Sequence, residues 1–222
     1  MVEQNKPVNQ AIDFIPLFAT PVMQVQLDLD LEKLTEFVFQ LQREDGEGVI
    51  LSNVGGWQSN PILEEKHKEF VRLKKEITQY LEIYHLKIYQ EMVFKENVTQ
   101  NIKDIWVNIN EKYHYNDWHI HGSNLSGIYY IKHDGSNENG NLTFKHPIHH
   151  WQYIMRSHWP YELIEEYNEA TSEYIDITPK SNMLLIFPSW LEHKAENNLK
   201  DDTRISLSFN SDLILEKNEI RR

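Results

Sequence analysis

The chain has 222 residues and no cysteine, and its 22 basic and 34 acidic side chains give a net charge of −12. This length suits one large domain with a sizeable core, and the acidic balance disfavours a nucleic-acid partner, because a phosphate backbone attracts basic surfaces. The absence of cysteine excludes a disulfide framework, a zinc ribbon and a thiol nucleophile. The N-terminus shows no signal-peptide pattern and no apolar run reaches the roughly 18 residues of a membrane span, so we expect a cytoplasmic protein.

The first half of the chain predicts a loose arm followed by helices. Residues 1–13 are polar, and residues 14–27 form an extended segment that two prolines interrupt. Asp30 can cap a first helix, and a longer one is expected over about residues 62–92. The apolar stripe of the longer helix is typical of packing against a sheet. We therefore expect a helical buttress over about residues 30–92.

From about residue 102 the apolar spacing changes to that of β-strands. Short apolar or alternating segments are separated by turn-forming residues, which is typical of a sandwich or barrel. An insertion at about residues 145–173 interrupts the strands and is expected to carry a short helix near 160–170. We expect one domain over residues 14–222. Its expected strands are 105–110, 125–131, 140–144, 174–178, 183–187 and 204–209.

Three histidines carry the clearest chemical signal. His119 and His121 are two residues apart, and such residues on a strand point to the same face. His193 follows a later apolar run and could bring a third imidazole to the same point. Three imidazoles would cover one face of a metal ion and leave the other positions open, as a catalytic metal needs. With 11 histidines in the chain, the pair alone is a weak signal, and its value rests on the residues around it.

Asp117 is an alternative to His121 as the third ligand. It also lies two residues from His119, so strand periodicity does not choose between the two. Iron(II) oxygenases usually employ a carboxylate, which favours Asp117.

The last predicted strand carries a polar stripe. Arg204, Ser206, Ser208 and Asn210 alternate with apolar residues, so the polar face would line a cavity if the apolar face packs inward. An ordinary half-exposed strand would show the same composition. The guanidinium of Arg204 matches a carboxylate, and together with the histidines it indicates an iron oxygenase that uses an organic acid.

Several segments, in the same order, resemble the iron(II)- and 2-oxoglutarate-dependent oxygenases, and more closely those of marine cyanobacteria and their phages. They cover most of the chain from about residue 14 to residue 212. The resemblance implies a mainly β fold with flanking helices, a double-stranded β-helix related to the jelly roll. The segments are IPLFATPV (15–22), SNVGGWQS (52–59), WVNIN (106–110), HIHGSNLSGIYYI (119–131), GNLTFKHP (140–147), LLIFPSWLEH (184–193) and RISLSFN (204–210).

The resemblance also implies the metal ligands. They would be His119, residue 121 and His193, in the order that the superfamily uses. Residue 121 is a histidine where the superfamily has a carboxylate, so the metal site would consist of three histidines. This departure from the superfamily pattern leaves Asp117 open as the third ligand. We prefer His121, because the turn after it, residues 122–124, resembles the family's exit from the ligand strand.

For the co-substrate, the resemblance implies that Arg204 and Ser206 hold the distal carboxylate of 2-oxoglutarate, with Tyr130 and Asn108 in contact with the same molecule. The implied activity uses iron(II), 2-oxoglutarate and O₂ to hydroxylate an unidentified substrate, with release of succinate and CO₂. A cupin-like metalloprotein is the alternative: an isomerase, a dioxygenase without co-substrate or a metal-dependent sensor. Such a protein has no need of Arg204. A jelly roll without enzymatic activity would leave the three imidazoles unexplained.

Overall fold

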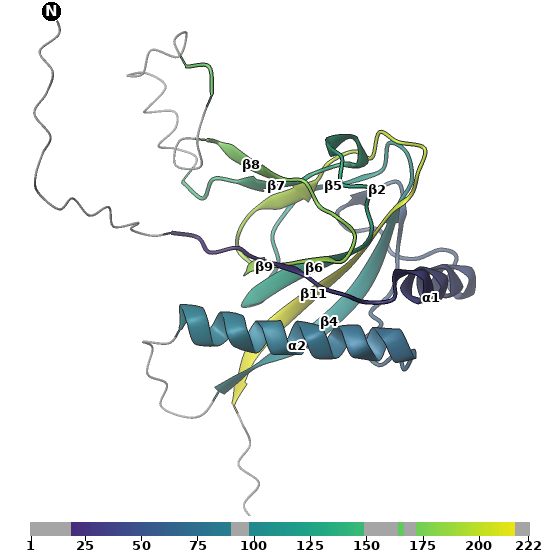
Figure 1. Ribbon diagram of the computed structural model, residues 1–222, viewed down its shortest axis with the longest axis horizontal. Coiled ribbons are helices and arrows are strands. Elements are labelled where there is room, and N and C mark those ends of the chain that lie inside the picture. The colour runs from purple at the N-terminus through teal and green to yellow at the C-terminus, as the bar shows by residue number, and fades with distance from the viewer. Residues whose placement is uncertain (1–18, 90–97, 149–163, 167–171, 216–222) are drawn as a thin grey trace, which may run out of the picture.

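The computed structural model describes residues 19–89, 98–148, 164–166 and 172–215. Figure 1 shows two layers of strands, with a long helix lying across the outer side of one layer. The mainly β architecture with flanking helices is the one that the sequence predicts. The expected N-terminal arm, and most of the helix expected in the insertion, fall outside the described residues.

The strands form two sheets of antiparallel pairs. The larger has the order β1-β9-β6-β11-β4-β3, and the smaller has the order β2-β5-β10-β7-β8. We call them the major and minor sheets. The major sheet comprises β1 (Met23–Gln26), β3 (Trp57–Gln58), β4 (Val98–Asn110), β6 (Leu125–Lys132), β9 (Met183–Pro188) and β11 (Arg204–Leu215). The minor sheet comprises β2 (Asn53–Val54), β5 (Tyr115–His119), β7 (Leu142–Lys145), β8 (Tyr174–Ile177) and β10 (His193–Ala195).

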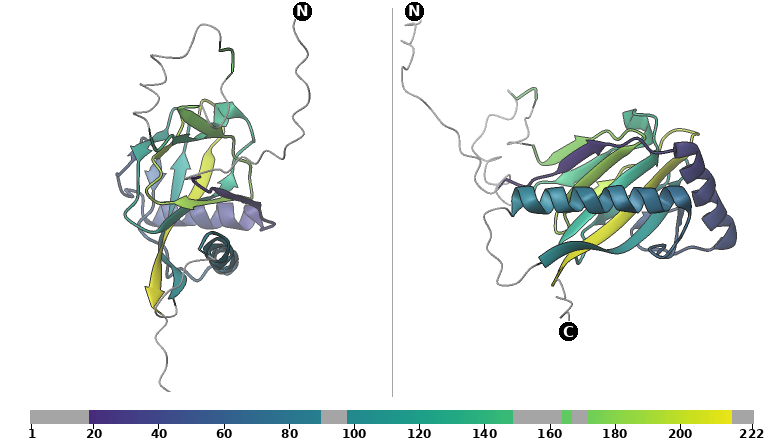
Figure 2. Two further views of the ribbon diagram at one scale, coloured as in Figure 1. Left: turned by 90° about the vertical axis from the view of Figure 1, so that its left-hand side faces the viewer. Right: turned by 60° about the horizontal axis from the view of Figure 1, so that its bottom comes forward.

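The first helix, α1 (Leu31–Glu44), begins where the sequence predicts. The side chain of Asp30 accepts a hydrogen bond from the backbone N–H of Lys33, which satisfies one of the free donors of the first turn. Figure 2 shows α1 at one end of the long helix. The carbonyl of Leu41 accepts the last backbone bond of α1, from the N–H of Asp45.

The second helix, α2 (Lys68–Ile88), begins six residues later than the sequence predicts. The preceding segment runs beside β4 instead, because the backbone N–H of Ile62 bonds the carbonyl of Ile105 at 2.8 Å. The apolar stripe of α2 is buried as expected and packs against the major sheet. The members of this stripe that are fully buried are Phe70, Leu73, Ile77 and Leu81.

The major sheet has an apolar layer on each face. Alternate residues of β4, including Ile105, Val107 and Ile109, turn toward the helices and join the larger core. A second core lies between the two sheets, where Phe144 and Phe187 pack edge to face at 5.0 Å. This second core is smaller, and the rest of the space between the sheets belongs to the site described below.

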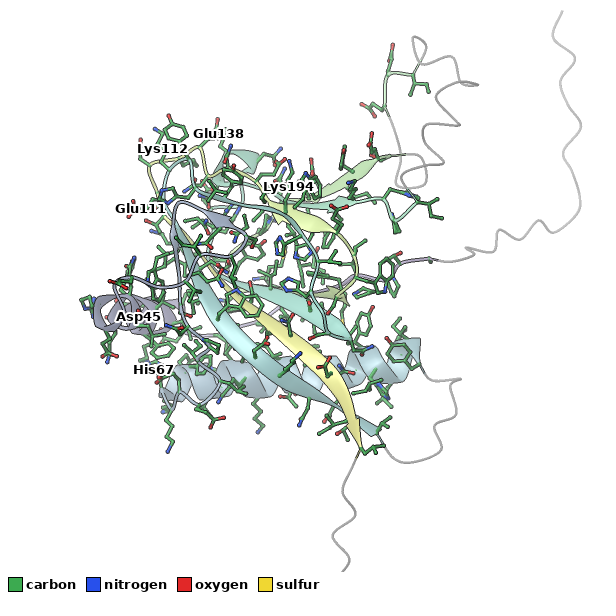
Figure 3. All side chains as sticks on the ribbon, turned by 180° about the vertical axis from the view of Figure 1, so that it is seen from behind. Asp45, His67, Glu111, Lys112, Glu138 and Lys194 are labelled. Carbon is green, nitrogen blue, oxygen red and sulfur yellow. The ribbon has the colours of Figure 1, made fainter. Side chains whose placement is uncertain are left out.

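The strand directions assign the connecting loops to two ends of the molecule. At one end, β4 finishes and β11 begins, and the loops 111–114, 133–141 and 196–203 bond to one another. The N–H of Leu199 donates to the carbonyl of Glu138 at 2.7 Å. Figure 3 shows Lys112 and Glu138 together at this end. We call it the closed end; the opposite end, where β5 finishes and β6 begins, is the open end.

Among the helices that the structure describes, none has the length and apolar character needed to cross a membrane.

The two leucines of α2 provide a test of its role as a buttress. Leu73 is fully buried against the major sheet, and Leu86 on the same helix is 66% exposed. We expect Leu73→Ala to lower the free energy of unfolding by about 2–5 kcal/mol, because it removes buried apolar contacts and leaves a cavity. The matched change Leu86→Ala should alter it by about 0.5 kcal/mol or less. Chemical denaturation measures both, and equal effects would contradict the packing described for α2.

Candidate functional site

A cavity of about 460 Å³ lies between the two sheets. Its size is within the range of small-molecule sites. The polar stripe of β11 lines it, as the alternation in the sequence predicts: Arg204, Ser206, Ser208 and Asn210 all face the cavity. Three histidines also line it: His119 and His193 from the minor sheet, and His121 from the segment just after β5.

His119, His121 and His193 lie together at the end of the cavity nearer the open end of the fold. Their possible ligand atoms all lie within 4.8 Å of one another. The rings of His119 and His193 are 4.3 Å apart between centroids, because β5 and β10 pair at these two residues. Among the described residues, this is the one cluster of histidines and carboxylates with metal-binding geometry.

Two of these imidazoles are oriented by backbone carbonyls. Nδ1 of His119 lies 2.6 Å from the carbonyl oxygen of Asp117, and Nδ1 of His193 lies 2.9 Å from that of Leu191. Because a carbonyl only accepts, Nδ1 carries the proton in both rings and Nε2 has a free lone pair. An outer hydrogen bond of this kind commonly fixes the orientation of a histidine that binds metal.

Burial keeps the cluster uncharged. It lowers the pKa of His193 to about 3 and that of His121 to about 4, and it also lowers the pKa of His119. Each ring is therefore neutral at pH 7, which is the state that coordinates a metal.

The structure separates Asp117 from the cluster. Between their two pairing positions, β5 has one more residue than β10, since His193 pairs with His119 and Ala195 with Asn116. This bulge breaks the alternation that places Asp117 and His119 on one face. Asp117 is exposed, and its carboxylate accepts a hydrogen bond from the N–H of Trp118. His121 lies just beyond the end of β5, with its ring 5.0 Å from that of His119.

Arg204 is buried at the closed end of the cavity, with 1% of its surface exposed. Nη1 donates to the carbonyls of Glu196 at 2.7 Å and Asn139 at 3.0 Å. Nη2 is buried and has no hydrogen-bond partner among the described residues. Burial lowers the pKa of Arg204 from its ordinary value, and a guanidinium still remains protonated at neutral pH. One half of the guanidinium is therefore held by the backbone, and the other half is available to a ligand.

A row of polar side chains crosses the major sheet at Ser206, two residues after Arg204 on β11. Ser206 pairs with Asn108 on one side and with Tyr130 on the other, and Asn108 in turn pairs with Gln58. All four residues line the cavity. Nδ2 of Asn108 donates to Ser208 at 3.3 Å, whereas its buried Oδ1 has no partner within the part of the chain that the structure describes. The structure thus brings together the residues that the resemblance implies for the co-substrate.

Some residues of the cavity are absent from the sequence prediction. Gln58 and Asp104 line it; Gln58 lies within the segment SNVGGWQS (52–59) without a predicted role, and Asp104 lies outside the segments that carry the resemblance. Trp106 also lines the cavity. Trp118 and Trp190 do not: Lys194 lies over the ring of Trp118, and Trp190 is 54% exposed.

The closed end holds one further unpredicted residue, His133. It is buried, Nδ1 accepts the N–H of Gly135 at 3.1 Å, and Nε2 lies 3.1 Å from the carbonyl of Gly140. Because Nδ1 accepts, the proton is on Nε2, which donates to that carbonyl. His133 therefore fixes the loop that supports Arg204. Its distance in sequence from the histidine cluster gives no signal of this role.

Comparison with known proteins finds a family match for this region. Residues 104–210 match the family described as "Putative 2OG-Fe(II) oxygenase". No curated protein sequence matches the chain.

Solved structures share the fold at low sequence identity. A viral collagen prolyl hydroxylase from Paramecium Bursaria Chlorella virus-1, in complex with 2-oxoglutarate, is 12% identical with a TM-score of 0.54, over 86% of this chain and 94% of that chain. The carbocyclase SnoK of nogalamycin biosynthesis is 12% identical with a TM-score of 0.58, over 90% and 84%. HygX from Streptomyces hygroscopicus, crystallised with nickel and 2-oxoglutarate and also with iron, is 13% identical with a TM-score of 0.51, over 87% and 82%.

These similarities confirm the predicted jelly-roll fold. The cyanobacterial and phage branch stays a prediction. Residues 104–210, which include every predicted site residue, match the 2OG-Fe(II) oxygenase family, whose cofactors are iron(II) and 2-oxoglutarate.

Proposed function

We propose that this protein is an iron(II)- and 2-oxoglutarate-dependent oxygenase that hydroxylates a second substrate and releases succinate and CO₂. The metal ligands are His119, His121 and His193. Arg204 and Ser206 bind the distal carboxylate of 2-oxoglutarate, and Tyr130 and Asn108 contact the same molecule. Bound iron(II) would supply the activation of O₂ and the oxidative decarboxylation.

The observation that carries the proposal is the unpaired half of Arg204. A buried guanidinium nitrogen without a partner is strongly unfavourable, so the site favours an anion. A carboxylate fits because its two oxygens match the fork of the guanidinium. Arg204 is also the one cation among the described residues that line the cavity. A cupin-like isomerase or sensor would leave this nitrogen without a role.

The geometry orients a dicarboxylate within the cavity. Arg204 begins β11 at the closed end, whereas His119 ends β5 and His193 begins β10 toward the open end. One carboxylate can bind Arg204 while the other end of the molecule lies toward the histidines. The second substrate then has the open end as its way in. The buried walls between the sheets exclude water from the space that the co-substrate occupies.

Gly140 makes this arrangement possible at the closed end. Its φ is +92°, and a Cβ at this position would lie 2.1 Å from Nη1 of Arg204 and 2.5 Å from the carbonyl oxygen of Glu196. Any side chain would therefore push the guanidinium away from its backbone acceptors. The glycine permits the close approach that keeps Nη2 directed to the cavity.

The proposed function is tested by thermal unfolding of the metal-free protein with added ligands. We expect 2-oxoglutarate to raise the melting temperature when iron(II) or manganese(II) is present, because a ligand that binds only the folded state stabilises it, by about 2.7 kcal/mol at 100 times its Kd. The metal-dependent rise should disappear in His193→Ala. Succinate formation under O₂ then measures turnover. Stabilisation by metal with no further effect of 2-oxoglutarate would support the cupin-like alternative instead.

Arg204→Lys tests the carboxylate site. A lysine ammonium cannot reproduce the planar fork, so we expect 2-oxoglutarate affinity to fall by at least about tenfold. Manganese(II) affinity, measured by calorimetry on the same sample, should stay close to that of the native protein. Equal loss of both affinities would indicate misfolding of Arg204→Lys, and the milder variant Ser206→Ala would then be measured in its place. Unchanged 2-oxoglutarate binding in both variants would refute the assignment.

A pair of variants tests the third metal ligand. We expect His121→Ala to weaken manganese(II) binding by more than the roughly 10–100-fold that loss of an outer partner causes. Asp117→Asn should leave it nearly unchanged, since this carboxylate is exposed and does not belong to the cluster. In a metal-bound structure, a nitrogen of His121 should lie about 2.0–2.2 Å from the ion. The opposite ranking of the two variants would assign Asp117 as the ligand and leave the oxygenase proposal intact.

The role of Gly140 is tested by Gly140→Ala, with Gly46→Ala as control. We expect the first to reduce 2-oxoglutarate affinity and to lower the free energy of unfolding by about 1–3 kcal/mol, because its backbone conformation is strained for alanine. A Cβ on Gly46 meets no atom within 4 Å, so the control should change neither quantity. Calorimetry and chemical denaturation provide the two readouts. Full 2-oxoglutarate affinity in Gly140→Ala would show that Arg204 does not depend on the close approach.

A further inference from the structure

The part of the cavity beyond the histidines differs in charge from the closed end. Arg204 and Asn210 are six residues apart on β11, which places their Cα atoms about 20 Å apart along the strand. Asn210 pairs with Asp104 of β4. Asp104 is the one carboxylate among the described residues that line the cavity. The cavity therefore has a cation at its closed end and an anion at its open end.

Among the described residues, no cation forms an ion pair with the carboxylate of Asp104. Its Oδ1 is shielded from solvent and has no hydrogen-bond partner in the described part of the chain. The neighbouring Lys103 is the extra residue of a bulge in β4, and its ammonium pairs with Asp212 at 3.5 Å. The residue opposite Asp104, Asn210, accepts a hydrogen bond from Ser126 at 2.8 Å. A shielded carboxylate oxygen without a donor is unfavourable, so this position favours a donor that a ligand brings.

An indole ring lies beside this carboxylate. Trp106 is two residues from Asp104 on the same strand, so both side chains face the cavity. The indole ring lies 5.7 Å from the ring of His121 between centroids, which places it next to the proposed metal ligands. Tryptophan is the aromatic residue that binds cations best through the face of its ring. A carboxylate and an indole side by side form a site for an organic ammonium group.

Apolar residues surround the remaining space at the open end. Pro61, Leu51 and Ile120 line the cavity there, and Leu51 and Ile120 are 77% and 60% exposed. These side chains can contact the carbon skeleton of a substrate whose charged group lies deeper. The net charge of −12 also attracts cations to the molecule from solution.

We infer that the primary substrate carries a protonated amine, which Asp104 and Trp106 bind at the open end of the cavity. The carbon to be oxidised then lies between this ammonium group and the histidines, with the apolar rim around the rest of the molecule. This inference rests on the proposed function for the reaction, but the ammonium site itself needs neither metal nor co-substrate.

The test uses matched pairs of small molecules: butylammonium and butanol, benzylammonium and benzyl alcohol, and tryptamine and tryptophol. Saturation-transfer NMR measures their binding to the metal-free protein. We expect the ammonium member of at least one pair to bind about tenfold more tightly than its alcohol, as a hydrogen-bonded charge pair provides. Asp104→Asn, which keeps the shape and removes the charge, should abolish the preference. Asp201→Asn removes the same charge from a side chain that is 92% exposed and should preserve it.

A second measurement locates the bound molecule. With manganese(II) loaded, the paramagnetic ion should broaden the ligand signals of the preferred ammonium in the native protein and not in Asp104→Asn. The inference is overturned if no ammonium binds better than its alcohol, or if the preference persists in Asp104→Asn. A preference that depends on Asp104 in a protein that does not bind 2-oxoglutarate would support the ammonium site and contradict the proposed oxygenase. Normal binding of 2-oxoglutarate without any preference for ammonium would support the proposed oxygenase and contradict the ammonium site.

Discussion

The buried charge of Arg204 is the constraint on which the closed end of this protein depends. A guanidinium with 1% exposure loses its hydration, so the protein has to replace those contacts or leave them to a ligand. Backbone carbonyls of Asn139 and Glu196 replace half of them. They come from two different loops, which approach each other because Gly140 has no side chain between them. His133 secures one of these loops through the carbonyl of Gly140.

The two sheets contribute different parts of the proposed site. The major sheet carries the polar row of the co-substrate on one face and packs its other face against α2, so the row stands on a rigid support. The minor sheet carries His119 and His193, which are directly paired across β5 and β10, and His121 follows β5. Neither sheet contains a complete site. The proposed chemistry exists only where the two sheets face each other, and most of its residues are positioned by strands.

Sequence periodicity predicted which face of β11 lines the cavity. Successive residues of a strand point to opposite faces, and Arg204 and Ser206 follow this alternation. Periodicity did not choose between Asp117 and His121 as the third ligand. A bulge in β5 separates Asp117 from the histidine cluster. Bulges depend on pairing with a distant strand, which periodicity does not contain. Asp104 has no local signal either, because a single carboxylate in an alternating strand is usually solvated. Its position in the cavity follows only from the pairing of β4 with β11.

The neutral charge of the three histidines couples the binding of the proposed metal to that of 2-oxoglutarate. Burial keeps all three uncharged, so a divalent metal would retain its full charge at the site, whereas a carboxylate ligand would cancel part of it. The two negative charges of 2-oxoglutarate can offset this charge and that of Arg204, so each ligand makes burial of the other more favourable. Such coupling is reciprocal: metal strengthens co-substrate binding by the same factor as co-substrate strengthens metal binding. The positive charge that remains adjoins the open end, where Asp104 can offset it and so permit a cationic substrate to approach the metal.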